Sequence, residues 1–161
     1  MKKIFLFSMA LILWTTAFQA TTLSAYAKAN EKVISETTEY FEDGSSLTIT
    51  VIEEGLLTRG TSYSKSGSKR CVMKNNSGNE LCSFTVHGTF SVNSESNVTC
   101  TAAFCSFSIT DDAWENDSAS AYCSENQAIG DATFIRKLLS ITIDSKSCHV
   151  VLTCDSDGNL S

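Results

Sequence analysis

Regular alternation of apolar and polar residues over positions 82–92 constrains the fold of this chain more than any other feature. The polar positions carry Ser, Thr and one histidine, His87. A period of two residues is typical of a half-buried strand in an antiparallel sheet. Gly88 interrupts the apolar face and indicates a bulge or a close backbone contact. The other residues of the apolar face are Cys82, Phe84, Val86, Phe90 and Val92.

Other segments carry the same β signal. Residues 46–51 alternate, and the Asp43-Gly44 pair before them is a good hairpin turn to a strand near 34–41. A strand over 97–110 is expected to contain a bulge near residues 103–104, because its apolar positions change face there. Shorter strands are expected near 118–123, 129–139 and 149–154.

These strands, their polar turns and the lack of a convincing amphipathic helix predict an all-β fold. The expected architecture is a disulfide-stabilised, antiparallel two-sheet sandwich, immunoglobulin-like, with an open barrel as the alternative. The sandwich domain is assigned to residues 61–161. Residues 28–60 are more charged and are expected to form an N-terminal hairpin or a flexible arm.

Residues 1–27 predict a cleaved secretory signal peptide. A positive start, Met1-Lys2-Lys3, precedes an apolar run, and Ala25-Tyr26-Ala27 forms an A-x-A cleavage site before Lys28. An uncleaved membrane anchor is the alternative, but the run is shorter than the roughly 20 residues that span a bilayer. We expect a secreted, extracellular protein, free or held at the cell envelope by non-covalent binding.

The charge of the chain restricts its partners. The formal net charge is −6, and removal of Lys2 and Lys3 with the signal peptide makes it −8. An acidic surface repels phosphate backbones and anionic lipids, so we expect no nucleic-acid partner. The part after the signal has no second long apolar segment, so no membrane insertion of the mature chain is expected.

All seven cysteines lie after the predicted signal peptide. An oxidising compartment favours disulfides, and an odd number leaves at least one thiol unpaired or joined to a second chain in a disulfide-linked homodimer. Cys148 and Cys154 lie about 20 Å apart along one predicted strand, too far to bond. Cys71 and Cys82 flank a polar turn and would face each other if the turn centred on Asn76-Ser77. The disulfide candidates are Cys71, Cys82, Cys100, Cys105, Cys123 and Cys154.

No motif predicts catalytic, cofactor-binding or metal-binding residues. Cys100-x₄-Cys105 lacks the second close pair of a zinc site. Two Ser-x-x-Lys matches, Ser62–Lys65 and Ser66–Lys69, fall in a serine-rich segment rather than at the start of a helix. Asp155–Asn159 resembles the start of a calcium loop without its remaining ligands and is interpreted as a terminal turn.

Two residues are singled out as candidate surface contacts. His87 lies on the polar face of its strand and is interpreted as a solvated surface histidine; the same interpretation applies to His149. Trp114, within a predicted single helical turn at 111–116, has two interpretations. It either plugs one end of the core or is an exposed aromatic side chain for a sugar or protein surface.

Several short segments resemble an uncharacterised family of small secreted all-β proteins from Gram-positive, gut-type bacteria, a domain of unknown function. They are Tyr40–Ser45, Thr85–Phe90, Val98–Thr101, Gly130–Phe134 and Leu152–Ser161. The resemblance implies an extracellular β domain in which Cys100 and Cys154 pair. It brings no catalytic residues and no cofactor.

Together these observations predict a secreted, non-enzymatic β-sandwich protein with a binding role outside the cell. The partner is an unknown extracellular protein or glycan, to which Ser/Thr-rich strand faces would offer hydroxyl hydrogen bonds. Two alternatives remain open. One is a secreted bacteriocin-like or toxin protein, suggested by the small size and dense cysteines. The other is a cell-wall or glycan hydrolase, suggested by acidic residues near Trp114 such as Glu115.

Overall fold

The structure is a computed structural model that describes residues 31–59, 62–93, 95 and 97–161. The chain divides into two units, residues 1–30 and residues 31–161, and only the second is described below. The predicted signal peptide therefore lies outside the described residues.

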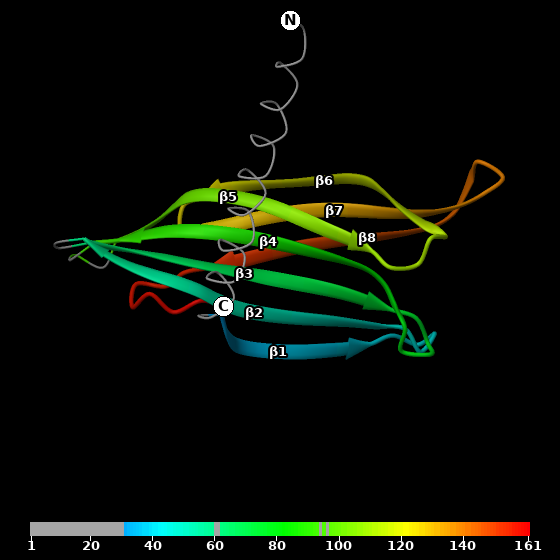
Figure 1. Cartoon of the computed structure of the whole chain (residues 1–161), viewed down its shortest axis with the longest axis horizontal. Coiled ribbons are helices and arrows are strands. Elements are labelled where there is room, and N and C mark those ends of the chain that lie inside the picture. The colour runs from blue at the N-terminus through cyan, green and yellow to red at the C-terminus, as the bar shows by residue number, and fades with distance from the viewer. Residues whose placement is uncertain (1–30, 60–61, 94, 96) are drawn as a thin grey trace, which may run out of the picture. The chain divides into compact units, whose positions relative to one another are not determined.

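The described chain consists of antiparallel strands and contains no helix. Within each of two sheets, every strand pairs with the next along the chain: one sheet has the order β1-β2-β3-β4-β5 and the other has the order β6-β7-β8 (Figure 1). The strands are β1 (Lys32–Tyr40), β2 (Ser46–Arg59), β3 (Ser62–Lys74), β4 (Glu80–Val92), β5 (Val98–Ile109), β6 (Trp114–Ser124), β7 (Gln127–Leu138) and β8 (Ile141–Thr153).

This architecture confirms the all-β, two-sheet prediction. The strand order within each sheet is strictly sequential. Immunoglobulin domains instead connect their sheets by Greek-key crossovers. The described part of residues 28–60 forms the β1–β2 hairpin. Its turn contains Gly44 at a φ of 79°, as the Asp43-Gly44 pair predicts.

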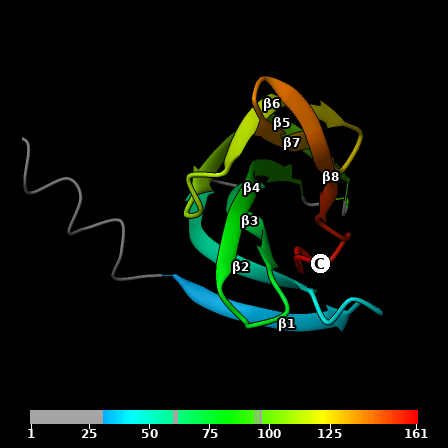
Figure 2. The ribbon, with the colours of Figure 1, turned by 90° about the vertical axis from the view of Figure 1, so that its right-hand side faces the viewer.

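The core lies between the inner faces of the two sheets, where β3 and β4 pack on β7 and β8 (Figure 2). The sheets approach each other closely at two glycines. A Cβ on Gly130 would lie 2.3 Å from Cγ2 of Val86, and a Cβ on Gly88 would lie 2.8 Å from the Cβ of Ala128. The close contact predicted at Gly88 is therefore present. The largest fully buried side chains are Phe84, Phe90, Phe134, Leu152 and Val86.

The segment after β8 completes the core. Leu160 is buried, and a Cβ on Gly67 in β3 would lie 2.3 Å from its Cδ1 atom. The turn at Asp155 is closed by its own carboxylate, which accepts hydrogen bonds from the backbone N–H groups of Asp157 at 2.9 Å and Asn159 at 2.8 Å. These bonds lower the pKa of Asp155. The segment is thus a terminal turn, as interpreted from the sequence.

Two disulfides join the five-stranded sheet to the three-stranded sheet. Cys71 of β3 bonds Cys148 of β8, and Cys100 of β5 bonds Cys123 of β6. The predicted Cys71–Cys82 bridge is wrong, because the turn between β3 and β4 is longer than assumed. Lys74 pairs with Glu80 across it, and a register shift between Met73 and Lys74 then places Cys71 opposite Phe84 and not opposite Cys82.

The Cys100–Cys154 pair implied by the family resemblance is also absent, because Cys100 is bonded to Cys123. Among the described residues three cysteines are free: Cys82 and Cys154 are buried, and Cys105 is half-buried. Burial raises the pKa of the Cys82 thiol to about 11, so this thiol is protonated at neutral pH.

Three local predictions need correction. Residues 111–113 form a turn and Trp114 begins β6, so there is no helical turn at 111–116. The bulge in β5 lies between Cys100 and Ala102, slightly before the predicted position. Strand β8 begins at Ile141 rather than near residue 149.

Candidate functional site

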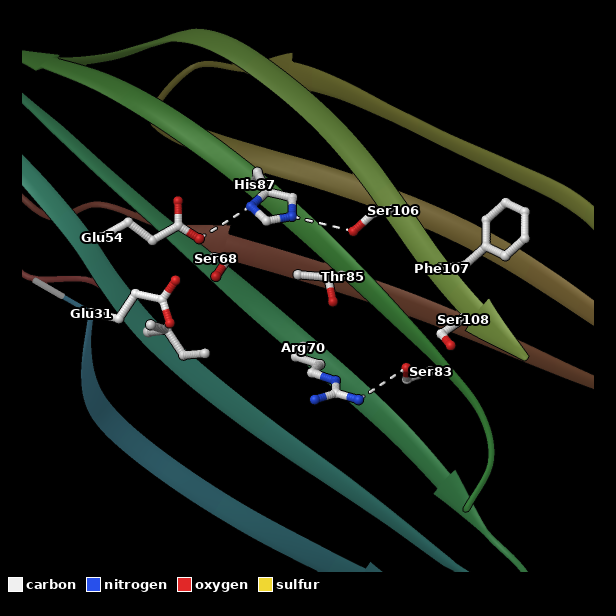
Figure 3. A pocket seen from close by; sticks show the side chains of 11 residues that line it. Glu31, Glu54, Ser68, Arg70, Ser83, Thr85, His87, Ser106, Phe107 and Ser108 are labelled. Atoms are coloured by element: carbon white, nitrogen blue, oxygen red, sulfur yellow. Dashed lines mark hydrogen bonds and ion pairs between the residues drawn. The ribbon is translucent and has the colours of Figure 1, made fainter. Parts of the chain in front are cut away.

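A polar hollow on the outer face of the five-stranded sheet is the candidate site (Figure 3). It has a volume of about 300 Å³ and is formed by β2, β3, β4 and β5 together with the residue before β1. The lining residues are Glu31, Ile52, Glu54, Ser68, Arg70, Ser83, Thr85, His87, Ser106, Phe107 and Ser108.

Strand alternation explains why these side chains face outward. In β4 the apolar positions 82, 84 and 86 are buried in the core, so 83, 85 and 87 lie on the opposite face. The register then aligns outward positions of neighbouring strands. Thr85 pairs with Arg70 on one side and with Ser106 on the other, and His87 pairs with Ser68.

His87 is the most connected side chain in the polar hollow. Its Nδ1 atom lies 3.1 Å from Oε1 of Glu54, and its Nε2 atom lies 3.3 Å from Oγ of Ser106. The ring stacks on Phe104, with 4.4 Å between ring centroids and an interplanar angle of 7°. With 22% of its side chain exposed, His87 is a partly covered, hydrogen-bonded residue. The interpretation as a solvated surface histidine is therefore corrected.

Glu54 is held as a carboxylate in this arrangement. The hydrogen bond from His87 lowers the pKa of Glu54 below its ordinary value of 4.5, and a hydrogen bond from Ser68 lowers it further. Partial burial opposes this effect and raises the pKa. Because a carboxylate only accepts hydrogen bonds, Nδ1 of His87 donates to Glu54, and in the tautomer with its single proton on Nδ1 the Nε2 atom accepts from the Ser106 hydroxyl.

Arg70 supplies a fixed positive charge to the polar hollow. Its Nη2 atom donates to Ser83 Oγ at 3.2 Å and to Glu80 Oε1 at 3.3 Å. These two contacts hold the guanidinium across the outer face of β3 and β4. Arginine presents several N–H donors in a planar fork and suits acceptor-rich ligands.

The other predicted surface contact, Trp114, does not reach the surface. Only 6% of it is exposed, and it packs within the core cluster. The exposed-aromatic interpretation is therefore wrong, and the interpretation as a core residue holds. The acidic residues near Trp114 consequently flank a buried tryptophan.

The remaining candidates from the sequence lie elsewhere. His149 donates from Nδ1 to Oδ1 of Asp131 at 2.7 Å, on a highly exposed part of the three-stranded sheet. The two Ser-x-x-Lys matches lie within β3, where residues three apart point to opposite faces. No group of three His, Cys, Asp or Glu side chains could hold a metal ion within the residues that the structure describes.

Sequence reasoning placed His87 on the correct face but missed its partners. Glu54 lies 33 residues away and Ser106 lies 19 residues away, each on another strand. The polar positions of the outer face could be identified from alternation, but their alignment required the strand registers and the bulge in β2 between Glu53 and Gly55.

Comparison of the chain with protein-family models, curated proteins and solved structures found no significant match. In the described part of the chain, no helix has the length and apolar character needed to cross a membrane.

Proposed function

We propose that this protein is secreted and binds a glycan outside the cell through the polar hollow. The observation that carries the proposal is the lining of this hollow. Five hydroxyl side chains, those of Ser68, Ser83, Thr85, Ser106 and Ser108, gather there with Arg70, His87 and two glutamates.

The chemistry of the lining favours a glycan over an apolar ligand. Pockets for small apolar molecules are lined mainly by hydrophobic and aromatic side chains. Hydroxyls both donate and accept hydrogen bonds, so they match a ligand that itself carries many hydroxyls. Phe104, exposed beside the hollow and stacked on His87, offers an apolar edge to the carbon face of a sugar ring.

The cysteine chemistry supports an extracellular location. Two disulfides join the sheets, and disulfides persist in oxidising compartments outside the cytosol. They agree with the predicted signal peptide and with the proposed place of this chain among secreted proteins of Gram-positive bacteria. Cys105, the least buried of the free thiols described, is the residue that would link two chains in the proposed homodimer.

A glycan array probed with the purified protein tests the proposal. Glycans from bacterial walls and from mucin are the first ligands to include. Arg70→Ala should weaken the affinity for the bound glycan about tenfold, because hydrogen bonds from charged groups contribute about 1.5–3 kcal/mol. Thr133→Ala, on the outward side of the three-stranded sheet, is the matched control and should bind like the unaltered protein.

Two results would contradict the proposal. One is the absence of binding to every glycan class on the array. The other is binding that Arg70→Ala and Thr133→Ala change equally, because that would place the ligand elsewhere on the surface.

A further inference from the structure

Three side chains in the polar hollow stand in the order of an acyl-transfer triad. A carboxylate, Glu54, contacts Nδ1 of His87 at 3.1 Å, and a hydroxyl, Ser106, contacts Nε2 of the same ring at 3.3 Å (Figure 3). They come from β2, β4 and β5. In serine hydrolases the acid orients the imidazole, which then accepts the serine proton.

We propose that Ser106, His87 and Glu54 form a hydrolytic site for short-chain carboxylic esters. This inference goes beyond binding and does not depend on the ligand being a glycan. The sequence-based expectation of a non-enzymatic protein rested on the absence of local motifs. A triad is defined by the geometry of three roles rather than by sequence spacing, so such a search would not find it.

The surroundings of His87 fix the ring in the orientation that this chemistry needs. Glu54 holds the tautomer with the proton on Nδ1, which leaves the Nε2 lone pair directed at Ser106. Phe104 covers one face of the ring through a near-parallel stack. Glu54 and Phe104 are therefore positioning residues, and Ser106 and His87 are the catalytic residues.

Ser106 is exposed, so an ester in the polar hollow can reach its hydroxyl oxygen. Thr85 pairs directly with Ser106, and Arg70 pairs with Thr85 on the next strand. These two side chains line the same hollow and are the hydrogen-bond donors available to the oxyanion that forms during attack. The arrangement therefore contains a nucleophile, a base and candidate oxyanion donors on one face.

The reaction consumes one ester and one water. Oγ of Ser106 forms a bond to the acyl carbon while its proton moves to Nε2 of His87. The bond from the acyl carbon to the leaving alcohol then breaks, and Nε2 returns the proton to that alcohol. Water hydrolyses the acyl-serine by the same route and releases the carboxylic acid. The shallow, hydroxyl-lined hollow favours small acyl groups on a polar alcohol.

Two measurements on the full secreted protein test the proposal. A fluorophosphonate probe should label the protein, and peptide mass spectrometry should place the adduct on Ser106. Hydrolysis of p-nitrophenyl acetate should fall at least about 100-fold in kcat/KM in Ser106→Ala and in His87→Ala. Glu54→Gln should lower kcat more than it changes KM and should shift the pH profile, since it acts through His87.

His149→Ala is the matched control, because it removes an exposed histidine that also contacts a carboxylate. It should leave both labelling and hydrolysis unchanged. An equal loss in His149→Ala and His87→Ala would mean background imidazole reactivity and would overturn the proposal. An adduct that does not lie on Ser106, or the absence of any adduct, would also overturn it.

The hydrolytic site and the glycan proposal can fail separately. Ser106 is exposed and His87 is partly exposed, so we expect Ser106→Ala and His87→Ala to fold. Thermal unfolding curves of both variants check this. A Ser106 adduct without glycan binding would retain the hydrolytic site and reject the glycan. Glycan binding without an adduct on Ser106 would retain the binding role and reject the hydrolytic site.

Discussion

The two sheets each carry one histidine paired with one carboxylate, but the two pairs have different surroundings. His87 and Glu54, on the five-stranded sheet, have 22% and 28% of their side chains exposed. His149 and Asp131, on the three-stranded sheet, have 62% and 53% exposed. In the first pair, the ring of His87 also stacks on Phe104 and forms a hydrogen bond with Ser106. Among the described residues, no such contacts are found for His149.

The difference shows that a close His–carboxylate contact is not by itself a site. The exposed pair is 2.7 Å apart and the partly buried pair is 3.1 Å apart, so the shorter contact belongs to the more exposed pair. Screening by water leaves an exposed pair with little energy, commonly below about 1 kcal/mol. Partial burial and a third partner are what give the five-stranded sheet its candidate site.

The largest loss of stability is expected on removal of the disulfides that join the two sheets. The Cys71–Cys148 bridge joins residues separated by 77 positions in the sequence, and the Cys100–Cys123 bridge joins residues separated by 23. The loop-entropy relation gives losses of about 4.5 and about 3.4 kcal/mol on their removal. Urea denaturation of Cys71→Ala/Cys148→Ala and Cys100→Ala/Cys123→Ala should therefore give the lower midpoint for the first variant. Equal midpoints, or midpoints unchanged from the original protein, would refute this ranking.

A smaller loss of stability is expected from a substitution at Gly130, where the two sheets are in close contact. Gly130→Ala would place a methyl group against Val86 and Phe84, and overpacking of this kind costs about 1–3 kcal/mol. Gly55→Ala is the matched control, because a Cβ there meets no atom within 4 Å. Thermal unfolding should show a lower Tm for Gly130→Ala alone. If both variants melt together, the two sheets are not packed as described.

The two histidines should differ in their contribution to stability. His87→Ala removes two hydrogen bonds and a ring stack and should cost about 1 kcal/mol. His149→Ala removes an exposed pair and should cost under about 0.5 kcal/mol. Chemical denaturation at pH 7 measures both free energies of unfolding. A larger loss in His149→Ala would reverse the comparison between the sheets.

The smallest expected effect is a pH dependence of the stability that arises from Glu54 on the five-stranded sheet. The pKa of Glu54 is lowered from 4.5 in the folded protein, mainly by the hydrogen bond from His87. A lowered pKa stabilises the fold at pH values above 4.5, and this stability is lost as the pH falls from 4.5 through the folded-state pKa. Glu54→Gln should therefore lose less stability between pH 5 and pH 3 than the original protein.

Urea midpoints at several pH values measure this slope. Glu39→Gln, on the exposed strand β1, controls for the removal of one carboxylate. A slope that is the same in Glu54→Gln and in the original protein would mean that the His87–Glu54 hydrogen bond contributes nothing in solution.

The pattern of apolar and polar residues was sufficient to predict strands that have one apolar face and one polar face. Alternation over residues 82–92 predicted β4 and its buried side, and the Asp43-Gly44 pair predicted the first hairpin. Strand β8 was underestimated because the turn before it carries Leu139 and Ser140 at positive φ, positions that usually take glycine or asparagine. Without such a signal the β7–β8 hairpin could not be identified from the sequence.

Features that depend on strand register or on packing of the sheets could not be predicted from the pattern of residues within single strands. The turn centred on Ser77 and the register shift between Met73 and Lys74 together move Cys82 by two positions relative to Cys71, so the predicted bridge could not form. Cys71 instead reaches Cys148 on the other sheet, 77 residues away. The partners of His87 come from two further strands for the same reason. Sequence reasoning could therefore predict the polar face and not the contacts on it.

Binding of a glycan in the polar hollow is tested most directly by NMR mapping of the bound ligand on the two sheets. The ¹⁵N-labelled protein would be titrated with the glycan that binds most tightly on the array, and amide shifts would be followed residue by residue. The largest changes are expected at Ser68, Thr85 and Ser106, with little change at Thr133 and Ser147 of the three-stranded sheet. Changes centred on Thr133 and Ser147 would contradict the assignment of function to the polar hollow.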